Sequence, residues 1–106
     1  MFALTTIEAT QSGNLVQQAC MLFGNNVVVL FDSGATHSFM YNECVRRLRL
    51  KLRELEHKLI VATPASDEVY TNSVCVGCPT EVAGRRFKVN LICLPMEGLN
   101  VILGME

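Results

Sequence analysis

The sequence has 106 residues, half of them hydrophobic, with a net charge of −1 and five cysteines. This length fits a single domain around one modest core, and the near-neutral charge argues against a nucleic-acid-binding surface. No apolar run approaches the roughly 20 residues that span a bilayer, no signal peptide is expected at the N-terminus, and the odd cysteine count favours free thiols in an intracellular, cytoplasmic protein.

The first half of the chain predicts two strands and one helix. Residues 14–22 read as a strand, and Gly24-Asn25-Asn26 as a turn, because Gly and Asn tolerate positive φ. The unbroken apolar run of residues 27–31 is typical of a strand buried on both faces, and it ends directly at Asp32. Apolar residues then recur at helical spacing, which predicts one short helix over residues 38–48.

The second half predicts further strands. Alternation of apolar and polar residues, or short apolar runs between turn signals, marks residues 48–53, 59–62, 68–71, 85–94 and 99–103. The runs on either side of residues 63–67 form a hairpin in this interpretation, and Cys78-Pro79 is expected to break the stretch after it. Six to eight strands and one short helix make the expected fold mostly β.

Asp32-Ser33-Gly34 is the tripeptide with the strongest chemical meaning. A carboxylate that follows a buried strand needs hydrogen bonds or a shared proton. Gly34 lets the backbone approach closely, and the Ser33 hydroxyl can bridge a local interface. Taken alone, the same three residues also fit an ordinary turn in which Asp and Ser satisfy backbone donors.

The surroundings of this tripeptide resemble a known family. Residues 28–39, Val-Val-Leu-Phe-Asp-Ser-Gly-Ala-Thr-His-Ser-Phe, are similar to the active-site segment of retropepsins, particularly those of gypsy-class LTR retrotransposons of plants. Residues 61–65 resemble the flap strand of that family, and residues 101–105 resemble its apolar-apolar-Gly segment near the end of the domain. The three segments come in the family's order and spacing, and the likeness covers residues 14–106.

The resemblance implies a retropepsin-like closed β-barrel subunit with a flap hairpin. It also implies an aspartic endopeptidase that cleaves a peptide or a retroelement polyprotein and works as a homodimer, with no cofactor, metal, nucleic acid or membrane. The implied site residues are the catalytic Asp32, the supporting loop Ser33, Gly34 and Ala35, the flap residues Thr63, Pro64, Ala65, Ser66 and Asp67, and the residues Ile102, Leu103 and Gly104 packed behind the loop.

The homodimer also follows from a count of carboxylates. Aspartic proteases use two of them sharing a proton, and this chain holds one Asp-Ser-Gly. A two-fold axis beside Asp32 would bring the second aspartate from another copy.

Two departures from the family pattern leave a second function open. The glycine that is common at the flap tip is absent around Asp67, and the sequence stops at Met105-Glu106, before the helix that usually follows. Residues 1–106 therefore read as a single domain with a truncated C-terminal helix. The alternative function is a catalytically inactive dimerisation or binding module with the same fold; a third hypothesis treats Asp32-Ser33-Gly34 as a phosphodegron.

Other motifs have plainer interpretations. Cys75-Val76-Gly77-Cys78 has the spacing of a zinc knuckle or a redox pair, although incidental strand cysteines fit as well. His37 is interpreted as a polar residue at a helix start, and His57 as a surface residue. The basic run of residues 46–53 is interpreted as a solvated helix face and strand rather than a phosphate-binding stripe.

Overall fold

Eight strands and one short helix make up the part of the chain that the structure, a computed structural model, describes: residues 4–8, 15–32, 36–62, 68–96 and 101–104. In chain order the elements are β1 (Leu4–Glu8), β2 (Leu15–Leu22), β3 (Asn25–Asp32), β4 (Ser38–Tyr41), α1 (Asn42–Leu48), β5 (Arg53–Ala62), β6 (Glu68–Val82), β7 (Arg85–Leu94) and β8 (Val101–Gly104). The mostly β prediction is confirmed. Within these residues, no helix is long and apolar enough to cross a membrane.

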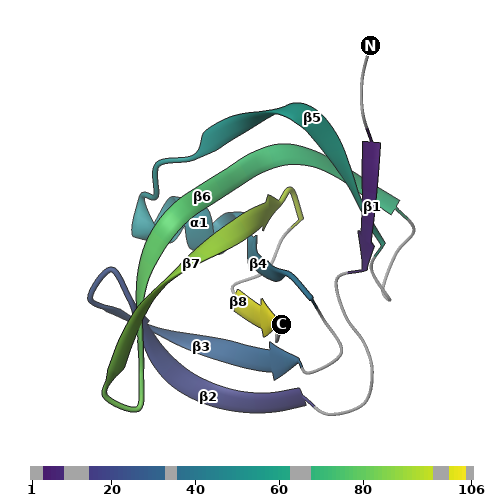
Figure 1. Cartoon of the computed structure of the whole chain (residues 1–106). Coiled ribbons are helices and arrows are strands. Elements are labelled where there is room, and N and C mark those ends of the chain that lie inside the picture. The colour runs from purple at the N-terminus through teal and green to yellow at the C-terminus, as the bar shows by residue number, and fades with distance from the viewer. Residues whose placement is uncertain (1–3, 9–14, 33–35, 63–67, 97–100, 105–106) are drawn as a thin grey trace.

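Six of the strands close into a barrel. The sheet order is β1-β5-β6-β2-β3-β8-β4-β7, and an additional β6–β7 pairing joins the last strand back to the third (Figure 1). Closure gives each of these six strands a partner on both sides, which removes exposed backbone edges. Strands β5 and β1 extend the sheet outward from β6, and β1 runs parallel to β5 with Leu4 opposite Lys58.

Two apolar clusters cover the two faces of the sheet. One contains side chains from α1 and from all six barrel strands, including Leu22, Val29 and Leu91. The other joins Phe39 and Ile102 to side chains of β5, β6 and β7. Adjacent residues of β4, β7 and β8 are therefore buried on opposite faces, which explains why these strands have continuous apolar sequences.

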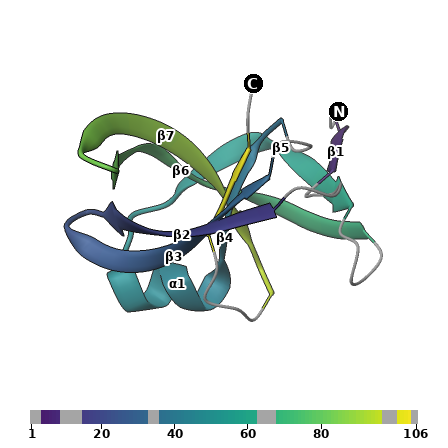
Figure 2. The ribbon, with the colours of Figure 1, turned by 90° about the horizontal axis from the view of Figure 1, so that it is seen from below.

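The long hairpin β5–β6 rises from the barrel and ends, on the described residues, at the pair Ala62 and Glu68. Figure 2 shows the ends of β5 and β6 beside β1 on one side of the molecule, while α1 lies beneath β3. The hairpin predicted around residues 63–67 is thus present in its two strands. Strand β1 was not predicted.

The predicted helix over residues 38–48 begins too early. Residues 38–41 form β4, which pairs with β7 on one side and β8 on the other, and α1 begins only at Asn42. Phe39 and Met40 are both fully buried because each face of β4 meets one of the two clusters. Their apolar character satisfies a helix or a doubly buried strand equally well.

The predicted strand over residues 48–53 is wrong except at its last residue. Arg49 ends α1 in the left-handed conformation with φ of 54°, and β5 starts at Arg53. The amide of Arg49 donates a hydrogen bond to the carbonyl of Arg46, which ends the helix in the way that a left-handed cap does.

Two further expectations about strands need correction. Residues 27–31 are not buried on both faces, because Val28 points outward with 43% of its surface exposed between the buried Val27 and Val29. Cys78-Pro79 does not break the chain, since β6 runs through both residues. Pro79 lies opposite Lys88 of β7, and its carbonyl accepts a hydrogen bond from the Phe23 amide at 3.1 Å.

Candidate active site

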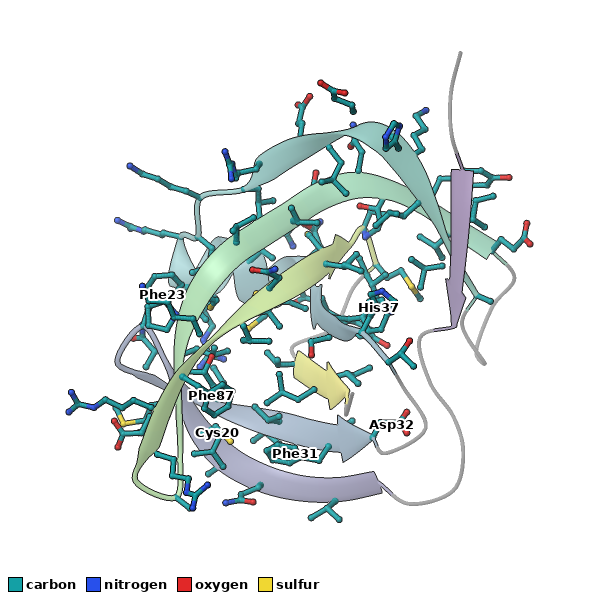
Figure 3. All side chains as sticks on the ribbon, viewed as in Figure 1. Cys20, Phe23, Phe31, Asp32, His37 and Phe87 are labelled. Carbon is teal, nitrogen blue, oxygen red and sulfur yellow. The ribbon has the colours of Figure 1, made fainter. Side chains whose placement is uncertain are left out.

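Asp32 is the last residue of β3 and is fully buried. Strand β3 lies between β2 and β8, so Asp32 has Leu15 opposite it on one side and Gly104 on the other. Figure 3 shows Asp32 at the tip of β3, on the side of the barrel where β1 and the ends of β5 and β6 lie. The fold therefore fixes the carboxylate by strand pairing on both sides of its own strand.

Strand β8 brings the three predicted packing residues beside β3. Ile102 lies opposite Leu30, Leu103 opposite Phe31, and Gly104 opposite Asp32. The side chains of Ile102 and Leu103 are buried, one in each apolar cluster.

Ser38 connects the end of β8 to the start of β4. Its hydroxyl oxygen accepts a hydrogen bond from the Gly104 amide at 3.1 Å. This amide belongs to the residue opposite Asp32. The serine thus holds the end of β8 in place next to the carboxylate, a contact that nothing in the sequence motif indicated.

A cavity of about 440 Å³ borders this region. It is lined in part by Thr36, His37, Ser38, Asn90 and Gly104. Thr36 and His37 are exposed, and the Thr36 hydroxyl lies 2.9 Å from Nδ1 of His37. The interpretation of His37 as a helix-start residue is wrong, because it precedes β4; the structure places it instead at the wall of a cavity near the candidate site.

Several predicted site residues lie outside the described residues. These are the loop Ser33, Gly34 and Ala35 and the flap residues Thr63, Pro64, Ala65, Ser66 and Asp67. Their roles remain predictions. The structure shows only the residues at the two ends of each segment. Residues 33–35 lie between Asp32 and Thr36, and residues 63–67 lie between Ala62 and Glu68.

Among the described residues, no group of three or more His, Cys, Asp or Glu side chains is arranged to hold a metal ion. All five cysteines are buried free thiols. Burial raises the pKa of the Cys78 thiol to about 12, with a further contribution from the neighbouring Cys75. His57 is exposed, as expected.

The fold is retropepsin-like: six strands close into a barrel, and a long hairpin extends from it. Asp32 ends one barrel strand beside the apolar-apolar-Gly strand β8. The whole chain, residues 1–106, matches the family model described as retroviral aspartyl protease. The protein therefore belongs to the retroviral aspartyl protease family.

Among solved structures, the chain is similar to the retroviral protease-like domain of Ddi1 from Leishmania major. The two share 17% sequence identity with a TM-score of 0.61, over 88% of this chain and 74% of that one. At this identity the likeness concerns the fold. A comparison with curated protein sequences gives no match.

Proposed function

We propose that the protein is an aspartic endopeptidase whose active site forms between two copies of the chain, each supplying Asp32. The observation that carries the proposal is the placement of Asp32, fully buried at the end of β3 with Gly104 opposite it. Membership of the retroviral aspartyl protease family supports the same chemistry.

The need for a second chain follows from the aspartates of this one. The sequence has two, Asp32 and Asp67, and only Asp32 is followed by Ser-Gly. A pair of carboxylates that shares one proton is the working unit of an aspartic protease. Two copies related by a two-fold axis would bring each Asp32 next to its own symmetry mate.

The proposed reaction uses the two carboxyl groups in different protonation states. Like charges about 3 Å apart do not both ionise, so one carboxyl group keeps its proton. The ionised group removes a proton from a water molecule as the water oxygen attacks the scissile carbonyl carbon, while the protonated group donates its proton to the carbonyl oxygen. The tetrahedral intermediate then collapses: the C–N bond breaks and a proton passes to the departing amine.

The substrate we propose is an extended segment of a polyprotein, of the kind a retroelement encodes. The hairpin β5–β6 ends on the same side of the molecule as Asp32 (Figures 1 and 3). An extended peptide held between that hairpin and the Asp32 loop would add its backbone hydrogen bonds to those of the strands.

Replacing Asp32 by Asn tests the catalytic role, because Asn keeps the shape and loses the ionisable group. Cleavage of a fluorogenic peptide library at mildly acidic pH should fall by at least roughly a hundredfold, with an unchanged circular dichroism spectrum. The matched control is Glu54→Gln, the same carboxyl-to-amide change at an exposed position of β5, which should keep most of the activity. Equal cleavage by wild type and Asp32→Asn would refute the proposal.

Mixing wild-type chain with an excess of Asp32→Asn tests the shared site. Under a homodimer, wild-type pairs fall with the square of the wild-type fraction, so activity should drop faster than the dilution. A linear fall would show that one chain suffices. An inactive wild type that still forms dimers by sedimentation would support the binding-module alternative.

A further inference from the structure

A β-bulge brings Cys75 and Cys78 to the same face of β6. Cys75 lies opposite Leu91 and Cys78 opposite Val89, so β6 takes three residue steps where β7 takes two. In a regular strand, residues three apart point to opposite faces. The extra residue of the bulge reverses the alternation, and both cysteines are buried in the barrel cluster while Val76 between them is exposed.

Gly77 makes this bulge possible. Its φ is +65°, in the left-handed region that side chains with a Cβ seldom adopt. The Gly77 amide donates a hydrogen bond to Oδ1 of the Asn90 side chain at 2.9 Å. The backbone between the two cysteines is thereby fixed.

The two thiols interact directly. Burial raises the pKa of both thiols; the hydrogen bond between them partly offsets this rise at Cys75 and adds to it at Cys78. Of the two thiols, Cys75 is therefore the one that loses its proton more readily.

One cavity is lined in part by Cys75, which is 4% exposed, and not by Cys78, which is 0% exposed. Its volume is about 550 Å³. Three cationic residues, Arg49, Lys51 and Lys88, also line it, and none of the described residues in its wall is a carboxylate. Phe23 also lines this cavity, and Figure 3 shows Phe23 on the opposite side of the barrel from Asp32.

We propose that Cys75 and Cys78 form a reversible dithiol–disulfide site, oxidised by hydroperoxides that enter through this cavity. Cys75 is the thiol that is oxidised first, and Cys78 is the thiol that resolves the resulting sulfenic acid. The site is independent of the proposed proteolysis.

The reaction has two balanced steps. The Cys75 thiolate attacks the hydroperoxide: an S–O bond forms, the O–O bond breaks, the sulfur becomes a sulfenic acid, and the oxidant leaves as an alcohol, or as water in the case of hydrogen peroxide. The Cys78 sulfur then attacks the Cys75 sulfur, forming the S–S bond, and the hydroxyl group leaves as water with the Cys78 proton. Excess dithiol reverses the result by exchange.

Other pairings are the competing outcomes. Cys44 of α1 is near enough to Cys78 to raise its pKa, so a Cys44–Cys78 bond is the main rival. A metal thiolate site is the other, although the described residues offer no third ligand to this pair.

Peptide mapping of the full-length reduced protein after hydrogen peroxide treatment tests the pairing. Trypsin cuts after Lys58 and Arg85, so residues 59–85 carry both cysteines, while Cys20 and Cys44 fall in residues 1–46 and Cys93 in residues 89–106. We expect the 59–85 peptide to become two hydrogen atoms lighter and resistant to alkylation, roughly tenfold faster than any other thiol is lost. Dithiothreitol should restore it.

Two results of this mapping would overturn the proposal: a cross-link between residues 59–85 and residues 1–46, or a 59–85 peptide that still takes two alkyl groups when other thiols are consumed. Zinc added alone provides a further check. Tight stoichiometric binding that blocks both alkylations would assign the pair to a metal instead.

Single variants test the order of attack. In Cys78→Ser, a dimedone probe should trap a sulfenic acid at Cys75, because no resolving thiol follows. In Cys75→Ser, Cys78 should stay reduced over the same time. Oxidation of Cys78 in that variant at the wild-type rate would refute the assigned roles. Should either variant fail to fold, the wild-type peptide map still decides the pairing.

Discussion

The amide of Gly104 donates a hydrogen bond to the hydroxyl of Ser38 over 3.1 Å, joining the end of β8 to the start of β4. Gly104 is also the residue opposite Asp32 on β3. One side-chain contact thus holds three neighbouring strands together at the candidate catalytic carboxylate. A short strand of four residues, such as β8, has few ladder bonds of its own, which makes this contact matter for the site.

Ser38→Ala should therefore affect stability and cleavage together. The variant leaves the Gly104 amide without its acceptor, at a cost of about 1–2 kcal/mol, and frees the end of β8 beside Asp32. Urea unfolding measures the first effect, and the cleavage assay the second. Ser38→Thr, which keeps the hydroxyl, should restore both. Thr36→Ala removes an exposed hydroxyl nearby and should change stability little; a loss equal to that of Ser38→Ala would contradict the argument.

Thr71 ties β6 to β7 beyond the end of their ladder. Its buried hydroxyl donates to the carbonyl of Cys93 at 2.7 Å and accepts from the Ser73 amide at 3.3 Å. Thr71→Val keeps the shape and removes both bonds, so it should destabilise the protein by about 1–2 kcal/mol in urea unfolding. The matched control is Thr80→Val, at another buried threonine of β6, whose hydroxyl donates at 3.1 Å to the carbonyl of Cys78, only two residues away. This change should cost less; equal effects would show that the tie between the strands adds nothing beyond a local bond.

The barrel strands were readable from sequence wherever a strand is flanked by turn residues. The predicted strands over residues 14–22 and 85–94 lie next to glycine-containing turns. They agree with β2 (Leu15–Leu22) to within one residue and with β7 (Arg85–Leu94) at both ends. Strand β4 was not readable, because Phe39 and Met40 owe their strand conformation to β7 and β8, which are distant in the sequence. Local periodicity carries no information about such pairing.

The sequence led to Asp32 but not to the contacts around it. A carboxylate directly after an apolar strand needs partners, but the tripeptide alone also fitted a turn, and the resemblance of residues 28–39 to the retropepsin active-site segment decided the prediction. The Ser38 contact depends on a backbone amide 66 positions away, and no residue pattern shows it. The bulge at Gly77 was likewise hidden, since a glycine between two cysteines fits a turn, a bulge or a regular strand.

Gly77→Ala should destabilise the protein through backbone conformation alone. A Cβ at this position would meet nothing within 4 Å, so no clash occurs. The φ of +65° is left-handed, where an L residue costs about 1–2 kcal/mol. Gly77→Asn should cost less, because Asn tolerates this region. Urea unfolding compares the two variants; an Ala variant as stable as wild type would show that the bulge relaxes easily.

The Cys78 thiol should make the protein less stable as the pH rises above its ordinary pKa. Burial, followed by the neighbouring Cys75, raises the pKa of Cys78 from 9.0 to about 12 in the folded state. Between these values the unfolded chain releases the proton and the folded chain keeps it. Unfolding is therefore favoured more and more as the pH rises. The contribution of the protonated Cys78 thiol to the free energy of unfolding is fully present below pH 9 and is lost towards pH 12.

Cys78→Ala isolates that effect from the titration of lysines and tyrosines, which both proteins share. The variant should be less stable than wild type at pH 8, since it loses a buried side chain. From pH 9 upward, its free energy of unfolding should fall less steeply than that of wild type, so the two curves converge. Urea unfolding at pH 8, 9, 10 and 11, with reductant present to keep every thiol reduced, measures both curves. Parallel curves over this range would mean that Cys78 titrates in the folded protein as it does in the unfolded chain, and that its thiol is not held in an apolar site.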